Sequence, residues 1–365
     1  MKIIFAGTPA IAIPSLKAIS KIHAANGGFC ELAGVLTNPD TAKGRHGGST
    51  PSELGAAAQK ILQDMTASGR TPFAILKSAR IDENCFRSVA AINADILVSF
   101  AYGTIFPPEF LAIFPMGGIN VHPSLLPKYR GATPIPAAIL NRDRETGISI
   151  QRLAQKTDCG NILAQERITL TGRETSAGLS VITGEKSAAL LVETLRAIAE
   201  GTVSETEQNH AEAVFCGKLE REDGRIDWRK SAIDIDAQIR AFTPWPLSYT
   251  WHCGIELYII EAAPYYGNFT LPDGASAGTV SMTAGAEWGG LAGGASEAAL
   301  DTASGRAKST AAPGTVLGFD KSAGIIIQTG DGLLAVSRLQ YRARKALDWK
   351  AFLNGAKEFI GAVLE

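Results

Sequence analysis

Residues 117–134 read GGINVHPSLLPKYRGATP, and the first part of this stretch has the pattern of a short strand with one polar face. Asn120 and His122 are two positions apart, so their side chains point the same way on an extended backbone. Pro123 ends the strand, because proline has no N–H to donate to a neighbouring strand. The pattern therefore places an amide and an imidazole together at the carboxyl end of a strand, where open α/β sheets bind their ligands.

Length and composition set the broad class of the protein. The chain has 365 residues, which favours two domains over a single core. Its net charge of −1 means that a nucleic-acid partner must be bound by local basic patches. The five cysteines include no CxxC pair, which indicates a reducing compartment and argues against a zinc site. Because no segment approaches about 20 consecutive apolar residues, we expect a cytoplasmic protein without a membrane span.

Strand and helix patterns alternate along the first 200 residues. We predict strands at 2–6, 32–37, 73–76, 95–100, 119–122 and 148–153, and helices at 11–22, from about 52, at 82–91 and at 177–200. This alternation predicts a doubly wound, mostly parallel α/β sheet with right-handed crossovers. Gly7 follows the first strand alone, without G-x-G-x-x-G, so we interpret that turn as structural and not as a dinucleotide site.

The C-terminal part has a different texture. Residues 203–220 lack an apolar period and are interpreted as a linker between a catalytic domain at 1–202 and a second domain at 221–365. In the second domain a helix at 231–241 precedes short strands separated by Gly and Asp turns, which indicates a small β-barrel. A Gly/Ala-rich insertion at about 275–312 is expected to form a loop.

Two basic segments have alternative interpretations. The loop TAKGRHGGS at 41–49 carries Lys43 and Arg45 among glycines. The segment 338–357 contains six basic residues against one acidic residue, with aromatic residues between them. A solvated surface is the ordinary explanation of a charge run, whereas a barrel with a cationic, aromatic edge is a recurring nucleic-acid surface.

Asn120, His122 and Asp158 together suggest a chemistry. We expect Asp158, in the turn after the strand at 148–153, to reach the same site from a neighbouring βα loop. An amide donor suits a developing oxyanion, a histidine can pass a proton, and a carboxylate can orient the imidazole. Taken singly, each residue also has an ordinary role: Asn120 in a turn, His122 as a buried imidazole, and Asp158 in an Asx turn.

No activated nucleophile accompanies this trio in the sequence. Ser124 lies outside a G-x-S-x-G elbow, and Cys159 has no paired base in its context. The trio therefore favours direct acyl transfer between two bound substrates over covalent catalysis.

Motif content and order together resemble the formyltransferase family that uses 10-formyltetrahydrofolate. The match combines Asn120-x-His122, the segment SLLPKYRGATP at 124–134, and Asp158-x-Gly160. In that family the Asn–His–Asp trio is catalytic and the Ser-Leu-Leu-Pro loop lines the folate site. The resemblance implies catalytic roles for Asn120, His122 and Asp158, and folate contacts for Ser124, Leu125, Leu126, Pro127 and Tyr102.

The resemblance extends over nearly the whole chain. Further matching segments are FAGTP at 5–9, TNPD at 37–40, AYG at 101–103, RIDW at 225–228, RAFTPWP at 240–246, PGTV at 313–316 and TGDG at 329–332. The C-terminal segments are similar to those of members that formylate methionyl initiator tRNA and have an OB-like C-terminal domain. This implies a basic loop that enters the acceptor stem, with tRNA contacts from Lys43, Arg45, Arg342, Arg344 and Lys345, and no metal. We expect the protein to be a monomer.

Two alternatives remain. A formyltransferase acting on a small amine, such as an amino sugar nucleotide or glycinamide ribonucleotide, would not need the Arg45 loop or the barrel. A non-catalytic folate- or tRNA-binding protein would have a broken trio, and here all three residues are present.

Overall fold

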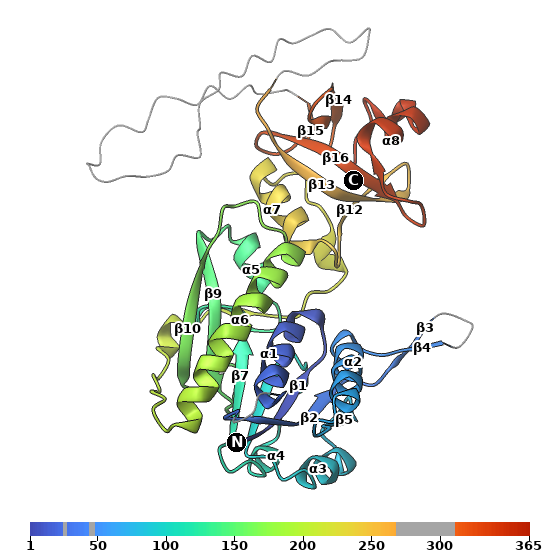
Figure 1. Cartoon of the computed structure of the whole chain (residues 1–365). Coiled ribbons are helices and arrows are strands. Elements are labelled where there is room, and N and C mark those ends of the chain that lie inside the picture. The colour runs from blue at the N-terminus through green and yellow to red at the C-terminus, as the bar shows by residue number, and fades with distance from the viewer. Residues whose placement is uncertain (25–27, 44–47, 268–310) are drawn as a thin grey trace. The chain divides into compact units, whose positions relative to one another are not determined.

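The computed structural model describes residues 1–24, 28–43, 48–267 and 311–365, which form two compact units. Unit 1 spans Met1–Lys218 and unit 2 spans Leu219–Glu365 (Figure 1). Most of the insertion predicted at 275–312 lies outside the described residues, as do Arg45 and the side chain of Lys43.

Within the described residues, unit 1 is built on a seven-stranded sheet with the order β10-β9-β7-β6-β1-β2-β5. Its strands are β1 (Lys2–Gly7), β2 (Glu31–Thr37), β5 (Ala74–Lys77), β6 (Ile96–Phe100), β7 (Gly118–His122), β9 (Glu145–Arg152) and β10 (Ile162–Thr169). Its helices are α1 (Ile13–Ala24), α2 (Glu53–Ala67), α3 (Glu83–Ala90), α4 (Pro108–Leu111), α5 (Pro134–Leu140) and α6 (Ser176–Ala199). Two short pairs lie apart from the sheet: β3 (Thr41–Lys43) with β4 (Gly48–Thr50), and β8 (Arg130–Gly131) with β11 (Phe215–Cys216).

The central strands are apolar on both faces, because helices cover both faces of the sheet. In β1, Ile4 and Ala6 pack against the α3 and α4 side, in a cluster with Val89 and Phe110. Strands β7, β6, β1, β2 and β5 pair in parallel, so the prediction of a mostly parallel sheet is confirmed. The predicted caps are also present: Ser52 accepts from the Gly55 N–H, and Asp82 accepts from the Cys85 N–H.

The sixth predicted strand runs in an unexpected direction. β9 pairs antiparallel with β7, and β10, which the sequence pattern missed, pairs antiparallel with β9. Asp158 therefore lies in the connection between two antiparallel strands, and the expectation that it belongs to a βα loop is wrong. The apolar pattern of a strand indicates burial but carries no information about direction.

Unit 2 is an antiparallel sheet domain with the strand order β12-β13-β16-β15-β14, and β17 pairs with β16. Its strands are β12 (Ser248–His252), β13 (Ile255–Tyr265), β14 (Val316–Asp320), β15 (Gly324–Gln328), β16 (Leu333–Tyr341) and β17 (Leu347–Asp348), and its helices are α7 (Ala232–Phe242) and α8 (Trp349–Gly355). Its core joins α7, the sheet and α8 through residues such as Trp228, Ile239, Leu339 and Phe352.

In the described parts of the chain, no helix has both the length and the apolar character that crossing a bilayer requires.

The unit 2 core offers a matched stability test. Leu339 and Leu347 face each other across β16 and β17, but Leu339 is fully buried and Leu347 is 40% exposed. Leu339→Ala should lower the free energy of unfolding by about 2–5 kcal/mol through lost burial and cavity formation. Leu347→Ala should cost less than about 1 kcal/mol.

All five tryptophans lie between Trp228 and Trp349, so tryptophan fluorescence during urea unfolding reports on unit 2. Equal losses of stability in the two variants would contradict the assigned core.

Candidate active site

The antiparallel pairing of β7 with β9 brings polar side chains of both strands onto one largely buried face. Asn120 lies opposite Gln151, and His122 lies opposite Ser149. The residues of each strand are two apart, so the four side chains share one face. Gln151 and Ser149 are both buried. Four polar side chains in this position each require hydrogen-bond partners.

His122 is 3% exposed and uses both of its ring nitrogens. Its Nε2 lies 2.8 Å from the main-chain oxygen of Tyr129. A carbonyl can only accept, so Nε2 carries a proton and donates it. Nδ1 then faces Oδ1 of Asp158 at 3.5 Å. The imidazole is thus oriented by a main-chain carbonyl on one side and by a carboxylate on the other.

Two strong hydrogen bonds fix the Asp158 carboxylate. The Gly131 N–H donates to Oδ2 at 2.8 Å, and Nε2 of Gln151 donates to Oδ1 at 2.7 Å. Nδ2 of Asn120 lies 3.5 Å from the same Oδ1, at the limit of hydrogen bonding. The carboxylate accepts from residues of β8 and β9, so it joins separate strands and does not form a local Asx turn. The structure thus brings the predicted trio Asn120, His122 and Asp158 together.

Several residues around the trio have a left-handed backbone without being glycine. The φ angles are 52° at Ala101, 58° at Tyr129 and 54° at Asp158. Such conformations are uncommon and concentrate at functional sites, where the surroundings maintain them. At Tyr129 this conformation accompanies the carbonyl that meets His122, and at Asp158 it accompanies the carboxylate that faces the same imidazole.

The predicted folate loop follows β7 directly and is closed by its own hydrogen bonds. Oγ of Ser124 is fully buried and donates to the Lys128 carbonyl at 2.6 Å. The Leu126 N–H donates to Oγ of Ser149 at 3.0 Å. The Ser124 hydroxyl therefore shapes the loop, while the side chains of Leu125 and Pro127 are only partly buried.

Tyr102, another predicted folate contact, has a buried side chain. Its hydroxyl donates to the Ser78 carbonyl at 2.6 Å, and its ring stacks on Phe106 with centroids 5.5 Å apart. Burial raises the pKa of this hydroxyl well above its ordinary value. A ligand contact at this position is thus limited to the main chain.

Four residues around Asp158 were missed by the sequence analysis: Gln151, Gly131, Arg130 and Gln208. The polar alternation Ser149-Ile150-Gln151 inside an apolar strand is the signal that points to Gln151. Arg130 and Gly131 lie within the matching segment 124–134 without a role assigned to them, and Gln208 carries no such signal. They act through β8 and through the segment 203–218, which belongs to unit 1 in the structure.

One cysteine lies against the main chain of the site, and its surroundings disfavour a nucleophilic thiolate. Cys216 lies in β11, with its Sγ 3.4 Å from the Tyr129 carbonyl. Burial raises the pKa of the Cys216 thiol, which favours the protonated form.

The predicted tRNA contacts of unit 2 follow β16. Arg342, Arg344 and Lys345 are all exposed. Nη1 of Arg342 lies 3.4 Å from Oε2 of Glu256. Within the described ranges, Arg344 and Lys345 have no ion pair. Lys43 and Arg45 fall where the structure describes no side chains.

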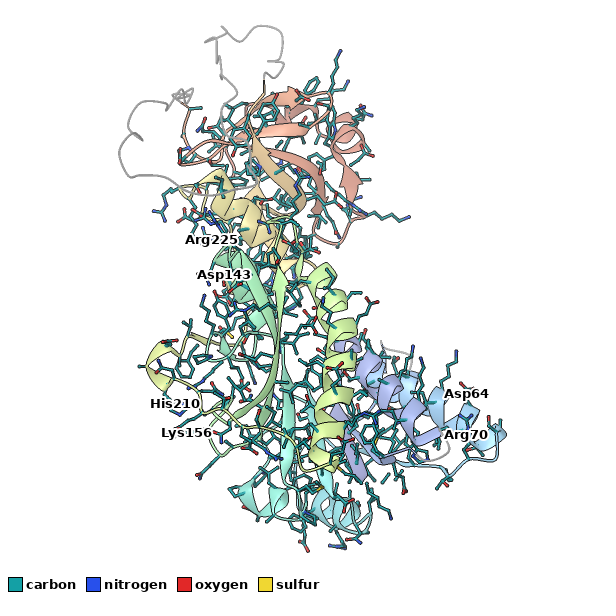
Figure 2. All side chains as sticks on the ribbon, turned by 60° about the vertical axis from the view of Figure 1, so that its left-hand side comes forward. Asp64, Arg70, Asp143, Lys156, His210 and Arg225 are labelled. Carbon is teal, nitrogen blue, oxygen red and sulfur yellow. The ribbon has the colours of Figure 1, made fainter. Side chains whose placement is uncertain are left out.

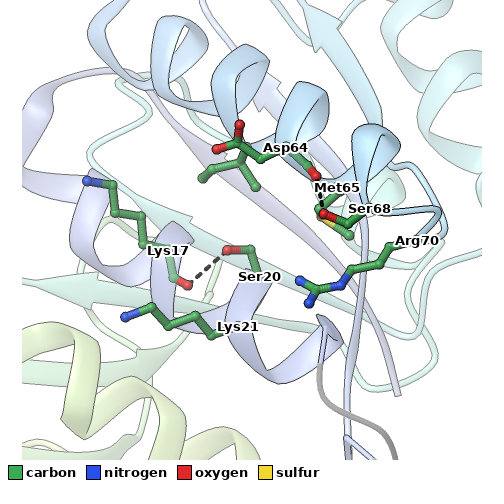
Figure 3. Close-up of a pocket in the computed structure, with 8 residues that line it drawn as sticks. Lys17, Ser20, Lys21, Asp64, Met65, Ser68 and Arg70 are labelled. Atoms are coloured by element: carbon green, nitrogen blue, oxygen red, sulfur yellow. Dashed lines mark hydrogen bonds between the residues drawn. The ribbon is translucent and has the colours of Figure 1, made fainter.

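A pocket of about 490 Å³ lies between α1 and α2 (Figure 3). Its lining includes the basic residues Lys17, Lys21 and Arg70 together with Asp64, and none of the trio. The three cationic side chains are exposed, so the pocket has the character of a solvated groove between helices.

Family models match both units. The model described as "Formyl transferase" matches residues 1–195, and "Formyl transferase, C-terminal domain" matches 218–287 and 295–357. Curated relatives named methionyl-tRNA formyltransferase match over the full length. The protein from Treponema denticola is 40% identical over 99% of this chain and 98% of its own length. The protein from Borreliella burgdorferi is 33% identical over 100% of this chain and 98% of its own length.

Solved structures show the same fold at low identity. HypX from Aquifex aeolicus, in complex with tetrahydrofolic acid, has a TM-score of 0.57 at 15% identity. The match covers 98% of this chain and 47% of HypX, so this chain spans about half the length of that protein. WlaRD, a sugar 3N-formyl transferase, has a TM-score of 0.57 at 18% identity, covering 94% of this chain and 99% of its own.

Gly160 tests the turn that carries Asp158. A Cβ at this position would lie 1.9 Å from the Arg152 carbonyl oxygen, so the turn would have to move. We expect Gly160→Ala to lower the formyl-transfer rate by about tenfold or more, since small displacements of a reacting group are costly.

Gly217→Ala is the control, because a Cβ there meets nothing within 4 Å. Comparable rates for Gly160→Ala and the wild type would show that Asp158 tolerates a shifted turn.

Proposed function

The chain belongs to the formyl transferase family, and from this premise we propose that it transfers the formyl group of 10-formyltetrahydrofolate to the α-amine of methionyl initiator tRNA. The observation that carries the proposal is the full-length match at 33–40% to relatives named methionyl-tRNA formyltransferase, in a chain whose Asn120, His122 and Asp158 are brought together. The match includes the C-terminal domain as well as the catalytic one.

The reaction is a direct transfer between two substrates. The amine nitrogen attacks the formyl carbon, the new N–C bond forms, the bond from that carbon to N10 of the folate breaks, and the proton lost by the amine passes to N10. Asn120 donates from Nδ2 to the oxyanion, and His122 stabilises the same charge from Nδ1 when the imidazole carries a proton on both ring nitrogens. Asp158 orients the imidazole and assists the movement of the proton. The long 3.5 Å contacts of Asn120 and His122 with Asp158 support these roles, because neither Nδ2 of Asn120 nor Nδ1 of His122 is held by a short hydrogen bond.

The folate site lies along the loop after β7. Leu125 and Pro127 contribute partly exposed side chains, while Tyr102, Ser124 and Leu126 contribute main-chain atoms. The tetrahydrofolic acid complex of HypX, a protein of the same fold, supports a folate co-substrate here.

The tRNA is bound by two basic elements on a monomeric protein in the cytoplasm. Lys43 and Arg45, in the arm of β3 and β4, contact the acceptor stem. Arg344 and Lys345 contact phosphates, and Arg342 contributes less because Glu256 partly neutralises it.

Loss of the catalytic groups should abolish transfer without abolishing binding. Asp158→Ala or His122→Ala should reduce formylation of charged initiator tRNA by about 10²–10⁴-fold, the usual contribution of an acid–base group. Asn120→Ala should cost about 10²–10³-fold, as for a single oxyanion donor. A gel assay measures formylation, and filter binding of the same tRNA should stay at the wild-type level.

Asp64→Ala, an exposed aspartate on α2, is the control. Full activity of the Asp158 or His122 variant would refute the catalytic assignment. Unchanged methionyl-tRNA together with turnover of a small amine would favour the alternative substrate class.

Phosphate contacts should appear in the salt dependence of tRNA binding. Arg45→Ala and Arg344→Ala should each lower the slope of log K against log salt concentration by about one unit, because each removes one phosphate contact. Lys321→Ala, an exposed lysine between β14 and β15, is the control. An unchanged slope for Arg45→Ala would show that Arg45, in the basic loop at 41–49, makes no phosphate contact with the tRNA.

A further inference from the structure

Gln208 lies in a stretch that neither family model matches, between residues 195 and 218. Its side chain is nevertheless only 4% exposed. A buried amide is stable only when its donors and acceptor are paired. The partners of Gln208 therefore indicate why this polar side chain is buried.

The nitrogen of the Gln208 amide binds the turn that carries Asp158. Nε2 lies 2.6 Å from the Gly160 carbonyl oxygen and 3.0 Å from the Asp158 carbonyl oxygen. Both partners can only accept, so the nitrogen and not the oxygen must face this turn. The bonds are made at the residue whose φ is 54° and at the glycine that packs against Arg152.

The oxygen of the same amide binds Arg130. Oε1 accepts from Nε at 3.1 Å and from Nη2 at 2.7 Å. Arg130 is 3% exposed, and no carboxylate of the described chain lies within ion-pair distance of it. Its remaining polar contact is 2.8 Å from Nη2 to Nδ1 of His210, the first residue of the short 3-10 helix His210–Glu212 (Figure 2). Gln208 thus supplies much of the solvation that this buried cation requires.

Both ends of the Gln208 amide act on the position of Asp158. Arg130 directly precedes Gly131, whose N–H donates to the Asp158 carboxylate. One end of Gln208 therefore fixes the main chain of Asp158, and the other fixes the strand that binds its side chain.

We propose that Gln208 is a positioning residue that sets the Asp158 carboxylate against His122, and this inference rests on the proposed role of the trio. Gln208 touches no reacting atom and no substrate. Its loss should therefore lower kcat and leave KM for both substrates almost unchanged.

Gln208→Glu separates the two functions of the amide. The carboxylate still accepts from Arg130, which preserves and strengthens that contact, but it has no proton to donate to Gly160 and Asp158. We expect kcat for formylation to fall about ten- to a hundredfold, as for a reacting group displaced by about 1 Å. Both KM values should stay within about threefold.

Gln238→Glu is the matched control. Gln238 is also 4% exposed, and its Nε2 donates to the carbonyls of Gly224 and Arg225 in unit 2. This variant should retain the wild-type kcat. If Gln208→Glu does not fold, Gln208→Met replaces it, because methionine keeps the side-chain volume and removes both hydrogen-bonding ends. The same fall in kcat with unchanged KM values is then expected.

A double-mutant cycle with Asp158→Ala tests whether Gln208 acts through Asp158. The expected result is that Gln208→Glu has no further effect on the residual rate of Asp158→Ala. Additive losses, a rise in KM at constant kcat, or a wild-type kcat in the Gln208 variants would overturn the proposal. Full activity of Asp158→Ala alone would instead refute the role of the trio, so the two failures are distinguishable.

Discussion

The site depends on the antiparallel pairing of β9 with β7. This pairing places Gln151 opposite Asn120 and Ser149 opposite His122, so that two strands contribute polar side chains to one buried face. β10 also pairs antiparallel with β9, so a short connection joins these two strands, and Asp158 lies in it. The reversal of direction at one edge of a mostly parallel sheet is therefore the constraint from which the local geometry follows.

The Asp158 carboxylate shows how a buried charge is stabilised without a permanent cation against it. Gln151 and Gly131 donate two short hydrogen bonds, which offset the cost of removing the carboxylate from water. The imidazole of His122 lies farther away, at 3.5 Å. Asp158 is therefore held by two short hydrogen bonds, while the contacts of His122 Nδ1 and Asn120 Nδ2 with it are both long, at 3.5 Å. A carboxylate held in place, beside two nitrogen atoms that make only long contacts, suits a site that must stabilise charge only during the reaction.

The segment between α6 and unit 2 is part of the catalytic unit in structural terms. β11 pairs in parallel with β8, and the side-chain amide of Gln208 donates to the main-chain carbonyl of Asp158. A polar, aperiodic composition suggests a linker because it lacks an apolar face that could pack. Here the segment is bound by hydrogen bonds from Gln208 and by strand pairing of β11, interactions that leave no hydrophobic period in the sequence.

The sequence by itself determined the parallel core of unit 1, the caps at Ser52 and Asp82, and the placement of Asn120 and His122 on one face of a strand. These follow from local rules: apolar runs form buried strands, short polar side chains cap helices, and residues two apart share a face. Tertiary structure alone decided the direction of β9, the inward-facing hydroxyls of Tyr102 and Ser124, and the partnership of Arg130 with Gln208. The reason is that strand pairing and buried hydrogen bonds join residues far apart in the sequence, such as Arg130 and Gln208 at a separation of 78 positions, and no local pattern records such a pairing.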